Sequence, residues 1–257
     1  MWLSLEGKNL GIVTADADLT VAVEQCVLGS LSFNGQRCTA IKMIFVHSSV
    51  APAFTAKFVE KVAALKSGLP WEDGVSITPL PEPSRPGFLL SLIEDAVGKG
   101  ATVVNSHLGG GTLKDNLLLP AVVSPVTESM RLWHEEQFGP VVPIAVYDDI
   151  EEVKTYIQKM PYGQQAAIFS TSAATTAPLV DLLSTAVGRI NINTQCGRSP
   201  DVFPFSGRRS SALGTLSVTE ALNAFSIETV VAFKAVPANS DLVAEAETIS
   251  NFLAPIN

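Results

Sequence analysis

The sequence predicts an α/β fold, in which a layered and largely parallel sheet is flanked by helices. Short apolar runs of strand length alternate along the chain with longer segments whose apolar residues recur every three or four positions. Such alternation is typical of parallel sheets covered by helices. The 257 residues are 47% apolar and 16% charged, a composition that supports a large buried core and argues against disorder.

The first elements follow this alternation closely. Asn9–Thr14 is a short apolar strand candidate, and Asp18 is placed to cap a helix over Leu19–Ser32. Ile41–Val46 has the pattern of a buried strand. A helix is expected after Ser48 or Ser49. Its apolar face consists of Phe54, Phe58, Val62 and Leu65.

The rest of the chain continues in the same way, with loop-rich stretches at Gly68–Pro86 and Thr194–Leu216. Further helices are predicted at Gly87–Lys99, Ile150–Gln158, Thr175–Ser184 and Ser217–Ala224. Further strands are predicted at Ala101–Asn105, Val141–Tyr147, Ala166–Ser170, Val187–Asn193 and Glu228–Lys234. We expect residues 1–224 to form one domain. Residues 225–257 would add an oligomerisation-type strand and a tail that is weakly helical at most.

Charge and cysteine content exclude several classes of function. The net charge of −8 argues against nucleic acid and anionic membranes as partners. No apolar run approaches the 18 or so residues of a membrane span, and the N-terminus does not resemble a secretory signal. The three cysteines have no metal-ligand spacing, so neither a disulfide framework nor a metal site is predicted. A reducing, cytoplasmic setting is expected.

The segment Phe33–Ala40 contains the strongest candidate for chemistry, the cysteine at position 38. Cys38 follows Gly-Gln-Arg on a tight connection between a predicted helix and a predicted strand. A nucleophilic thiol needs such a place, because the thiolate is the attacking form and apolar burial disfavours it. Cys26 and Cys196 are expected to be buried apolar residues.

A second motif, Glu-Glu-Gln-Phe-Gly-Pro-Val, lies about a hundred residues downstream at Glu135–Val141. Together the two segments resemble the aldehyde dehydrogenase superfamily, and the resemblance runs from about Leu3 to Lys234. It implies that the Cys38 thiolate attacks an aldehyde, that hydride leaves to a nicotinamide cofactor, and that water hydrolyses the resulting thioester. The Cys38 backbone N–H would be one donor to the oxyanion.

The same resemblance implies a coenzyme contact at Leu5, Glu136 and Phe138. The Glu136 carboxylate would accept hydrogen bonds from ribose hydroxyls, and the Phe138 ring would give an apolar face. The alternative is an ordinary surface carboxylate and a core aromatic residue before a Gly-Pro turn. NADP is the implied coenzyme.

Two arginines suggest the subfamily. Arg37 and the segment Arg198–Phe205 resemble the non-phosphorylating glyceraldehyde-3-phosphate dehydrogenases, as does Met130–Trp133. In that subfamily arginines at these two positions bind the substrate phosphate, which suits the guanidinium fork. The alternative is a pair of solvated arginines. Ser199 stands where the subfamily usually has glycine, a change that bears on how the loop aims Arg198.

Two departures limit the resemblance. The coenzyme-binding half of the family is absent from this sequence, and Ser4 stands where the family has its general-base glutamate. A serine hydroxyl cannot act as a base near neutral pH. Glu6 would face the same side as Ser4 in an extended segment, which makes it the candidate for a partial replacement.

Three functional readings follow. In the first, the chain is the catalytic half of an enzyme that oxidises a small phosphorylated aldehyde. In the second, it is an impaired relative with a structural or oligomer-forming role. In the third, it is a hydrolase that acts through Cys38 alone. Nothing in the spacing places His47, His107 or His134 beside Cys38 for a Cys/His dyad. We expect dehydrogenase activity of this chain alone to be impaired, homo-oligomers to be possible, and an exposed apolar face near Leu5, Cys38 and Phe138.

Overall fold

The computed structural model describes residues 3–253, apart from the side chain of Ser4. Internal contacts divide the chain into two compact units, one ending at Val218 and the other beginning at Thr219. The predicted division into a domain of residues 1–224 and a tail stays a prediction. Within the described range no helix has the length and apolar character needed to cross a membrane.

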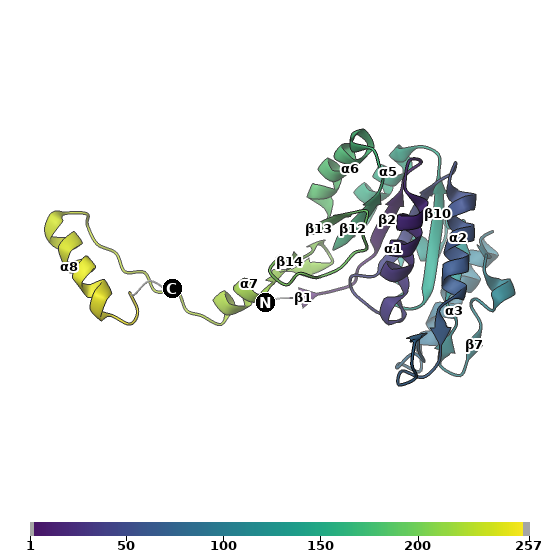
Figure 1. The fold of residues 1–257 in the computed structure, drawn as a ribbon, viewed down its shortest axis with the longest axis horizontal. Helices are drawn as coiled ribbons and strands as arrows, with labels where there is room; N and C mark the ends of the chain where they lie inside the picture. The colour runs from purple at the N-terminus through teal and green to yellow at the C-terminus, as the bar shows by residue number, and fades with distance from the viewer. Residues whose placement is uncertain (1–2, 254–257) are drawn as a thin grey trace. The chain divides into compact units, whose positions relative to one another are not determined.

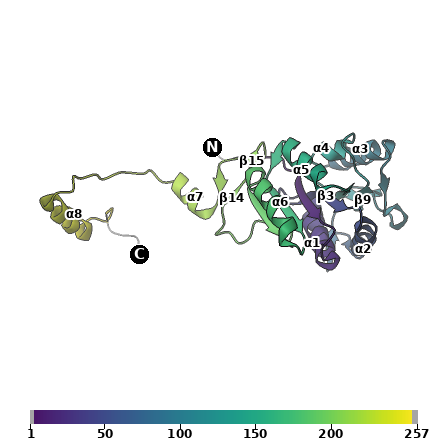
Figure 2. The same cartoon turned by 90° about the horizontal axis from the view of Figure 1, so that it is seen from above.

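A seven-stranded sheet is the centre of the first unit (Figures 1 and 2). Its order is β13-β12-β2-β3-β10-β9-β6, and all neighbours are parallel except β6 and β9. Its strands are β2 (Asn9–Val13), β3 (Ile41–His47), β6 (Thr102–Val103), β9 (Ala121–Ser124), β10 (Val141–Tyr147), β12 (Gln165–Phe169) and β13 (Arg189–Ile192). The predicted α/β class with a largely parallel sheet is therefore confirmed.

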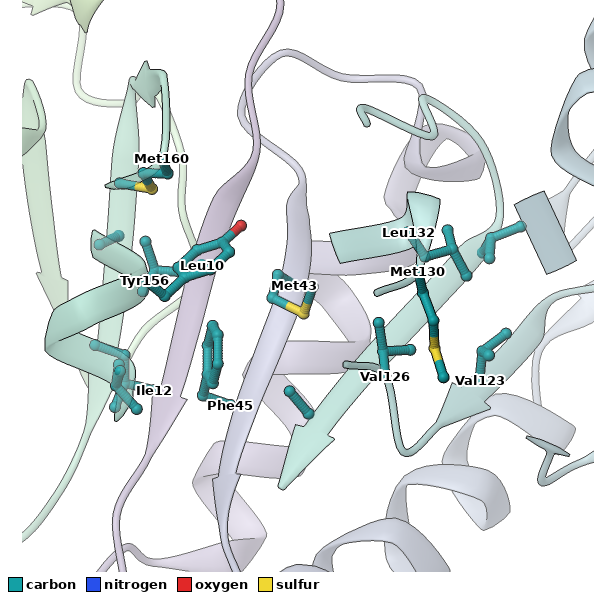
Figure 3. Close-up of a cluster of buried hydrophobic side chains, with 14 of the residues drawn as sticks. Leu10, Ile12, Met43, Phe45, Val123, Val126, Met130, Leu132, Tyr156 and Met160 are labelled. Atoms are coloured by element: carbon teal, nitrogen blue, oxygen red, sulfur yellow. The ribbon is translucent and has the colours of Figure 1, made fainter. Parts of the chain in front are cut away.

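Helices cover both faces of this sheet, and Figure 2 shows α1 and α2 on one side of it and α3, α4 and α5 on the other. The helices of the first unit are α1 (Leu19–Leu31), α2 (Ala51–Ala63), α3 (Arg85–Gly98), α4 (Arg131–His134), α5 (Ile150–Lys159) and α6 (Ala173–Ala186). Alternation along a strand explains both layers, because successive side chains point to opposite faces. Met43 and Phe45 pack with α5, whereas Ile44 and Val46 pack with α1 and α2. Figure 3 shows the hydrophobic cluster that contains Met43, Phe45 and Tyr156 of α5.

Short elements complete the chain. They are β1 (Leu3–Ser4), β4 (Lys66–Ser67), β5 (Val75–Ile77), β7 (Leu113–Lys114), β8 (Leu117–Leu118), β11 (Tyr162–Gly163), β14 (Phe205–Ser206), β15 (Arg208–Arg209), β16 (Ala212–Leu213), β17 (Thr215–Leu216), the 3₁₀ turns η1 (Ser32–Gly35) and η2 (Ser106–Leu108), α7 (Val218–Ala224) and α8 (Pro237–Ile249).

The carboxyl ends of β2 and β12 are tied together by one carboxylate. Asp16 accepts hydrogen bonds from the Thr14 hydroxyl at 2.8 Å, the Ser170 hydroxyl at 2.8 Å and the Thr171 N–H at 2.6 Å. Burial raises the pKa of Asp16, but these hydrogen bonds outweigh it and hold that pKa well below its usual range. The carboxyl ends of these two strands are consequently joined by a polar network.

Two predictions for the C-terminal region are wrong. Residues Glu228–Lys234 form no strand, and Pro237–Ile249 form the helix α8 rather than a weakly helical tail. An extended segment becomes a strand only when a neighbour accepts its backbone hydrogen bonds. The described part of this chain offers Glu228–Lys234 no such neighbour, so the apolar β pattern alone did not produce a strand. Homo-oligomerisation stays a prediction.

Candidate active site

The turn after α1 determines where Cys38 lies. Phe33, Asn34 and Gly35 have positive φ values of 54°, 59° and 68°, so the chain reverses sharply after the helix. The buried Asn34 side chain anchors this turn. It donates to the Thr78 carbonyl and hydroxyl and accepts from the Thr78 N–H at 2.8 Å. The fixed turn then leads through Cys38 into β3.

Gly35 brings the two sequence motifs into backbone contact. A Cβ atom at Gly35 would lie 2.6 Å from the Gly139 carbonyl oxygen and 2.7 Å from that of Ser30. Only glycine tolerates both this approach and the positive φ. The cysteine segment and the Glu-Glu-Gln-Phe-Gly-Pro segment are therefore adjacent.

Cys38 is half-buried and precedes the first residue of β3. Its carbonyl oxygen accepts hydrogen bonds from the Asn9 side-chain amide at 2.7 Å and from Lys42 Nζ at 3.3 Å. The same Asn9 amide donates to the Ala40 carbonyl at 2.9 Å. Neighbouring strands thus hold the nucleophile candidate at the amino edge of the sheet.

Glu136 and Phe138 meet Cys38 through a shared lysine. Glu136 Oε1 accepts from Lys42 Nζ at 2.7 Å and from the Gly7 N–H at 3.1 Å. The Lys42 ammonium lies 5.5 Å from the centre of the Phe138 ring. Phe138 itself has a φ of 39°, which is uncommon for a bulky residue. The structure thus brings Cys38, Glu136 and Phe138 together.

Lys8 is a second buried lysine beneath this segment. Its ammonium donates to the Glu135 carbonyl at 2.6 Å and to Gln137 Oε1 at 2.7 Å. Burial and then the Lys42 charge lower the pKa of Lys8 to about 7, against the opposing effect of Glu136 and Glu135. Burial also lowers the pKa of Lys42, although Glu136 opposes this.

Cys38 lines a cavity of about 630 Å³. Arg37, Arg189, Arg198 and Phe205 also line it. The predicted pair Arg37 and Arg198 is therefore brought to the cysteine, and Arg189 joins them. Arg198 stacks on Phe205 with its guanidinium carbon 5.2 Å from the ring centre.

The arginine charges are poorly compensated within the part of the chain that the structure describes. Arg37 donates to the hydroxyls of Ser32 and Thr39 and to the Cys196 carbonyl, all neutral acceptors. Arg189 likewise donates to the Asn191 side chain and to the carbonyls of Arg198 and Ser199. Arg198 lies 3.7 Å from Asp201 in an exposed pair, which contributes little. A cavity with such a surplus attracts anions.

The residues near the N-terminus lie on the β1–β16 ribbon, where Leu3 pairs with Leu213. Leu5 is 47% exposed, and Leu3 and Leu213 are exposed beside it. The apolar face expected here is thus exposed at Leu5, whereas Cys38 and Phe138 are half-buried. Glu6 Oε2 accepts a hydrogen bond from the Tyr162 hydroxyl at 3.1 Å.

Ser4, at the expected position of the general base, has its backbone in β1, and its side chain lies outside the described part of the chain. Two of the histidines make local hydrogen bonds, His47 to the Ser49 hydroxyl and His134 to the Glu128 carbonyl. No histidine of the described chain lines the Cys38 cavity. Within residues 3–253 no cluster of His, Cys, Asp or Glu is arranged to hold a metal ion.

Four residues of the site were missed by sequence reasoning: Lys8, Asn9, Lys42 and Arg189. Lys42 could have been noticed, because it is a single charged residue inside the apolar run of β3. A fully buried lysine without a partner is rare, so such an interruption indicates a specific counter-charge. No comparable signal marks Arg189.

Comparison with known proteins identifies the lineage. The sequence profile of the aldehyde dehydrogenase family matches residues 1–231. The chain belongs to this family. It is also similar to the NADP-dependent glyceraldehyde-3-phosphate dehydrogenases of Streptococcus equinus, with 38% identity over 226 residues, and Pisum sativum, with 35% identity over 221 residues. Each match covers 86% of this chain, and 45% and 43% of those relatives respectively.

A solved family member has the same architecture. The crystal structure of NADP-dependent glyceraldehyde-3-phosphate dehydrogenase from Bacillus halodurans C-125 complexed with NADP superposes with a TM-score of 0.81 at 39% identity. The match covers 86% of this chain and 45% of that one. The chain therefore spans about half the length of the relatives that it matches.

Proposed function

We propose that this chain is the catalytic half of an aldehyde dehydrogenase that oxidises a small phosphorylated aldehyde, glyceraldehyde 3-phosphate, to its acid with NADP. The observation that supports this most directly is the cavity that contains both Cys38 and the arginine cluster of Arg37, Arg189 and Arg198. A thiol and an anion site in one cavity fit a substrate with a carbonyl at one end and a phosphate at the other.

The arginine cluster supplies the recognition. Guanidinium groups bind phosphate oxygens through paired N–H donors, and Arg37 and Arg189 are already oriented by neutral acceptors. Pre-oriented donors lose less entropy on binding. Arg198, whose exposed pairing with Asp201 is weak, is free to turn toward a bound phosphate.

Cys38 supplies the covalent chemistry. Its thiolate attacks the aldehyde carbon, and the carbonyl π electrons become an alkoxide that the Cys38 N–H can stabilise. When bound, the nicotinamide coenzyme accepts the hydride that this carbon must lose. Water then attacks the thioester carbon and expels the thiolate, so that the acid is released and Cys38 is regenerated.

The residues present fit the nicotinamide-ribose end of the coenzyme. In the described part of the chain the contacts of Glu136 all use Oε1, which leaves Oε2 for a ribose hydroxyl. The exposed Leu5 side chain and the half-buried Phe138 ring offer apolar surface for the coenzyme. Glu136, Phe138 and Leu5 are thus the proposed coenzyme contacts.

The final hydrolysis is the weak step of the proposed mechanism. Removal of a positioned general base typically costs about 10²–10⁴-fold in rate, and Ser4 cannot replace one. Glu6 is engaged by Tyr162 in a surface hydrogen bond. We therefore propose that thioester formation at Cys38 outpaces its hydrolysis in this chain.

A protection experiment tests the cavity as a phosphate site. Iodoacetamide should alkylate Cys38 in the full chain, as located by mass spectrometry, and glycerol 3-phosphate should slow this reaction, whereas glycerol should not. Arg198→Ala should weaken the protection several-fold, since it removes one of three guanidinium groups. Arg85→Ala, which removes a half-buried arginine that pairs with Glu82 and does not line the cavity, is the matched control and should leave the protection unchanged.

Equal effects of glycerol and glycerol 3-phosphate would contradict the proposed phosphate site. Reduction of NADP by the chain with glyceraldehyde 3-phosphate, absent in Cys38→Ala, would test the complete reaction. Retention of that reduction in Cys38→Ala would overturn the assigned role of the thiol.

A further inference from the structure

Lys42 is a buried residue of the site to which the proposed mechanism gives no role. It lies in the middle of an otherwise apolar strand pattern, and its side chain is only 2% exposed. Burying an ammonium group is costly unless it is paired and hydrogen-bonded. Its retention in the core of β3 therefore demands a reason.

Its contacts give that reason. One ammonium group binds the Glu136 carboxylate at 2.7 Å and the Cys38 carbonyl at 3.3 Å, and it lies 5.5 Å from the Phe138 ring centre. Cys38 and Glu136 are far apart in the sequence, and Lys42 connects the two segments directly. Few side chains other than lysine could reach both partners from the interior of a strand.

We propose that Lys42 is a positioning residue that sets both the place and the reactivity of Cys38. Its ammonium group fixes the carbonyl of the cysteine segment against the Glu136 segment. Its positive charge attracts negative charge that develops on the cysteine sulfur. The inference rests on the proposed function, in that Cys38 is the nucleophile.

The balance of buried charge supports this role. Two lysines, Lys8 and Lys42, lie beneath the two motifs, and Glu136 is the carboxylate that contacts one of them. Glu135 is directed elsewhere, to Arg131 at 2.7 Å. Arg37 and Arg189 face the same cavity as Cys38 and donate to neutral acceptors, so the surroundings of the thiol carry a surplus of positive charge to which Lys42 adds. Charges interact more strongly where water is excluded. An anion at the Cys38 sulfur would offset that surplus.

The inference predicts effects of opposite sign from the two partners of one ion pair. Removing Lys42 removes positive charge from the neighbourhood of the thiol, whereas removing the charge of Glu136 exposes more of it. If the Lys42–Glu136 pair had only a structural role, both variants would change the reactivity of Cys38 in the same direction. The direction of the effect therefore separates the two explanations.

The rate of Cys38 alkylation by iodoacetamide measures this without any coenzyme or substrate. The thiolate displaces iodide, so the rate follows the thiolate fraction across pH. The two other thiols react poorly, because burial raises the pKa of Cys196 to about 12 and raises that of Cys26 well above its ordinary value. Mass spectrometry of the full chain assigns the product to Cys38.

Lys42→Met should lower the alkylation rate at pH 7 by about tenfold and move the midpoint of the rate–pH profile upward by about one unit, the scale of a single lost nearby charge. Lys42→Gln, which keeps a hydrogen-bond donor but no charge, should move the midpoint in the same direction. Glu136→Gln should move it downward. Lys57→Met, at an exposed position on α2, is the control and should not move it.

Three outcomes would overturn the proposal. They are an unchanged midpoint in Lys42→Gln, a shift of the same sign in the Lys42 and Glu136 variants, or a change confined to the high-pH plateau, which reports access rather than charge. If Lys42→Met fails to fold, the Gln variants still decide. Failure of the phosphate site is a separate result, since protection by glycerol 3-phosphate does not depend on this midpoint.

Discussion

At the scale of single residues, the active-site region depends on two lysines that the sheet buries. Lys8 directly precedes β2, and Lys42 lies in the adjacent parallel strand β3. Each lysine binds the segment that contains Glu136. Lys8 donates to a carbonyl and an amide oxygen, so within residues 3–253 the protein solvates its ammonium without a direct counter-ion. A titration near neutrality follows from this arrangement.

The first residue-scale prediction concerns the pH dependence of stability. The pKa of Lys8 is about 7 in the folded protein and about 10.4 when unfolded, so between these values the unfolded state binds more protons. The free energy of unfolding should therefore rise with pH above about 7, by up to about 1.4 kcal/mol per unit from this group. Below pH 7 the full cost of the buried charge is present.

Urea unfolding of Lys8→Met and the unmodified chain between pH 6 and 8.5 measures this contribution. The difference between the two curves should change with pH, whereas Lys57→Met, an exposed control, should run parallel to the unmodified chain. A constant difference for Lys8→Met would contradict the assignment.

At the scale of elements, the path from α1 through η1 to β3 was largely predictable. Asp18 caps α1 as expected, accepting from the N–H groups of Thr20 and Val21. The strand over residues 41–46 and the connection that holds Cys38 also agree with the predicted order. Hydrophobic periodicity and helix capping depend on neighbouring residues only, so a single sequence is enough to predict them.

Long-range features were not predictable in this way. The strand β9 (Ala121–Ser124) joins the sheet between β10 and β6, and its short apolar run gave too little pattern to be noticed. The pairing of Lys42 with Glu136 joins residues from separate motifs. Contacts of this kind depend on the folded topology, which a local pattern does not encode.

The element-scale prediction concerns Gly35, where the two motifs meet. Gly35→Ala should lower the free energy of unfolding by about 2–4 kcal/mol, since an alanine suffers both the left-handed backbone and the clash with the Gly139 and Ser30 carbonyls. Denaturant unfolding, monitored by circular dichroism, measures this loss in the free energy of unfolding.

Gly98 provides the matched control for that change. It lies in α3, and a Cβ atom there would meet nothing within 4 Å. Gly98→Ala should be neutral or stabilising by up to about 1 kcal/mol, because alanine is the better helix former. If Gly35→Ala loses no more stability than Gly98→Ala, a side chain at position 35 does not clash with the neighbouring motif, and the prediction is wrong.

At the scale of the whole molecule, the buried clusters are formed by residues before Val218. Both hydrophobic clusters consist of residues from Leu10 to Cys196, and neither α7 nor α8 has a buried residue. Stability scales with the apolar surface removed from water. The tail should therefore contribute little to the folding of the sheet.

A chain ending at Ala224 tests this expectation. Its melting temperature, measured by calorimetry, should lie within about 2 °C of the full chain, because 1 kcal/mol shifts a domain of this size by about 2–4 °C. Ile157→Ala, which empties a fully buried position on α5, serves as the comparison and should lower it by about 5 °C or more. A loss on truncation as large as that of Ile157→Ala would contradict the expectation.

The two edges of the sheet are built differently, and this asymmetry has a consequence for how the protein can change. At the carboxyl edge, Asp16 ties the end of β2 to the end of β12, whereas the amino edge carries Cys38 in the connection that enters β3. A scaffold fastened at one end tolerates remodelling at the other. New substrate preferences can therefore be grafted onto the loops that enter the strands while the framework beneath them stays the same.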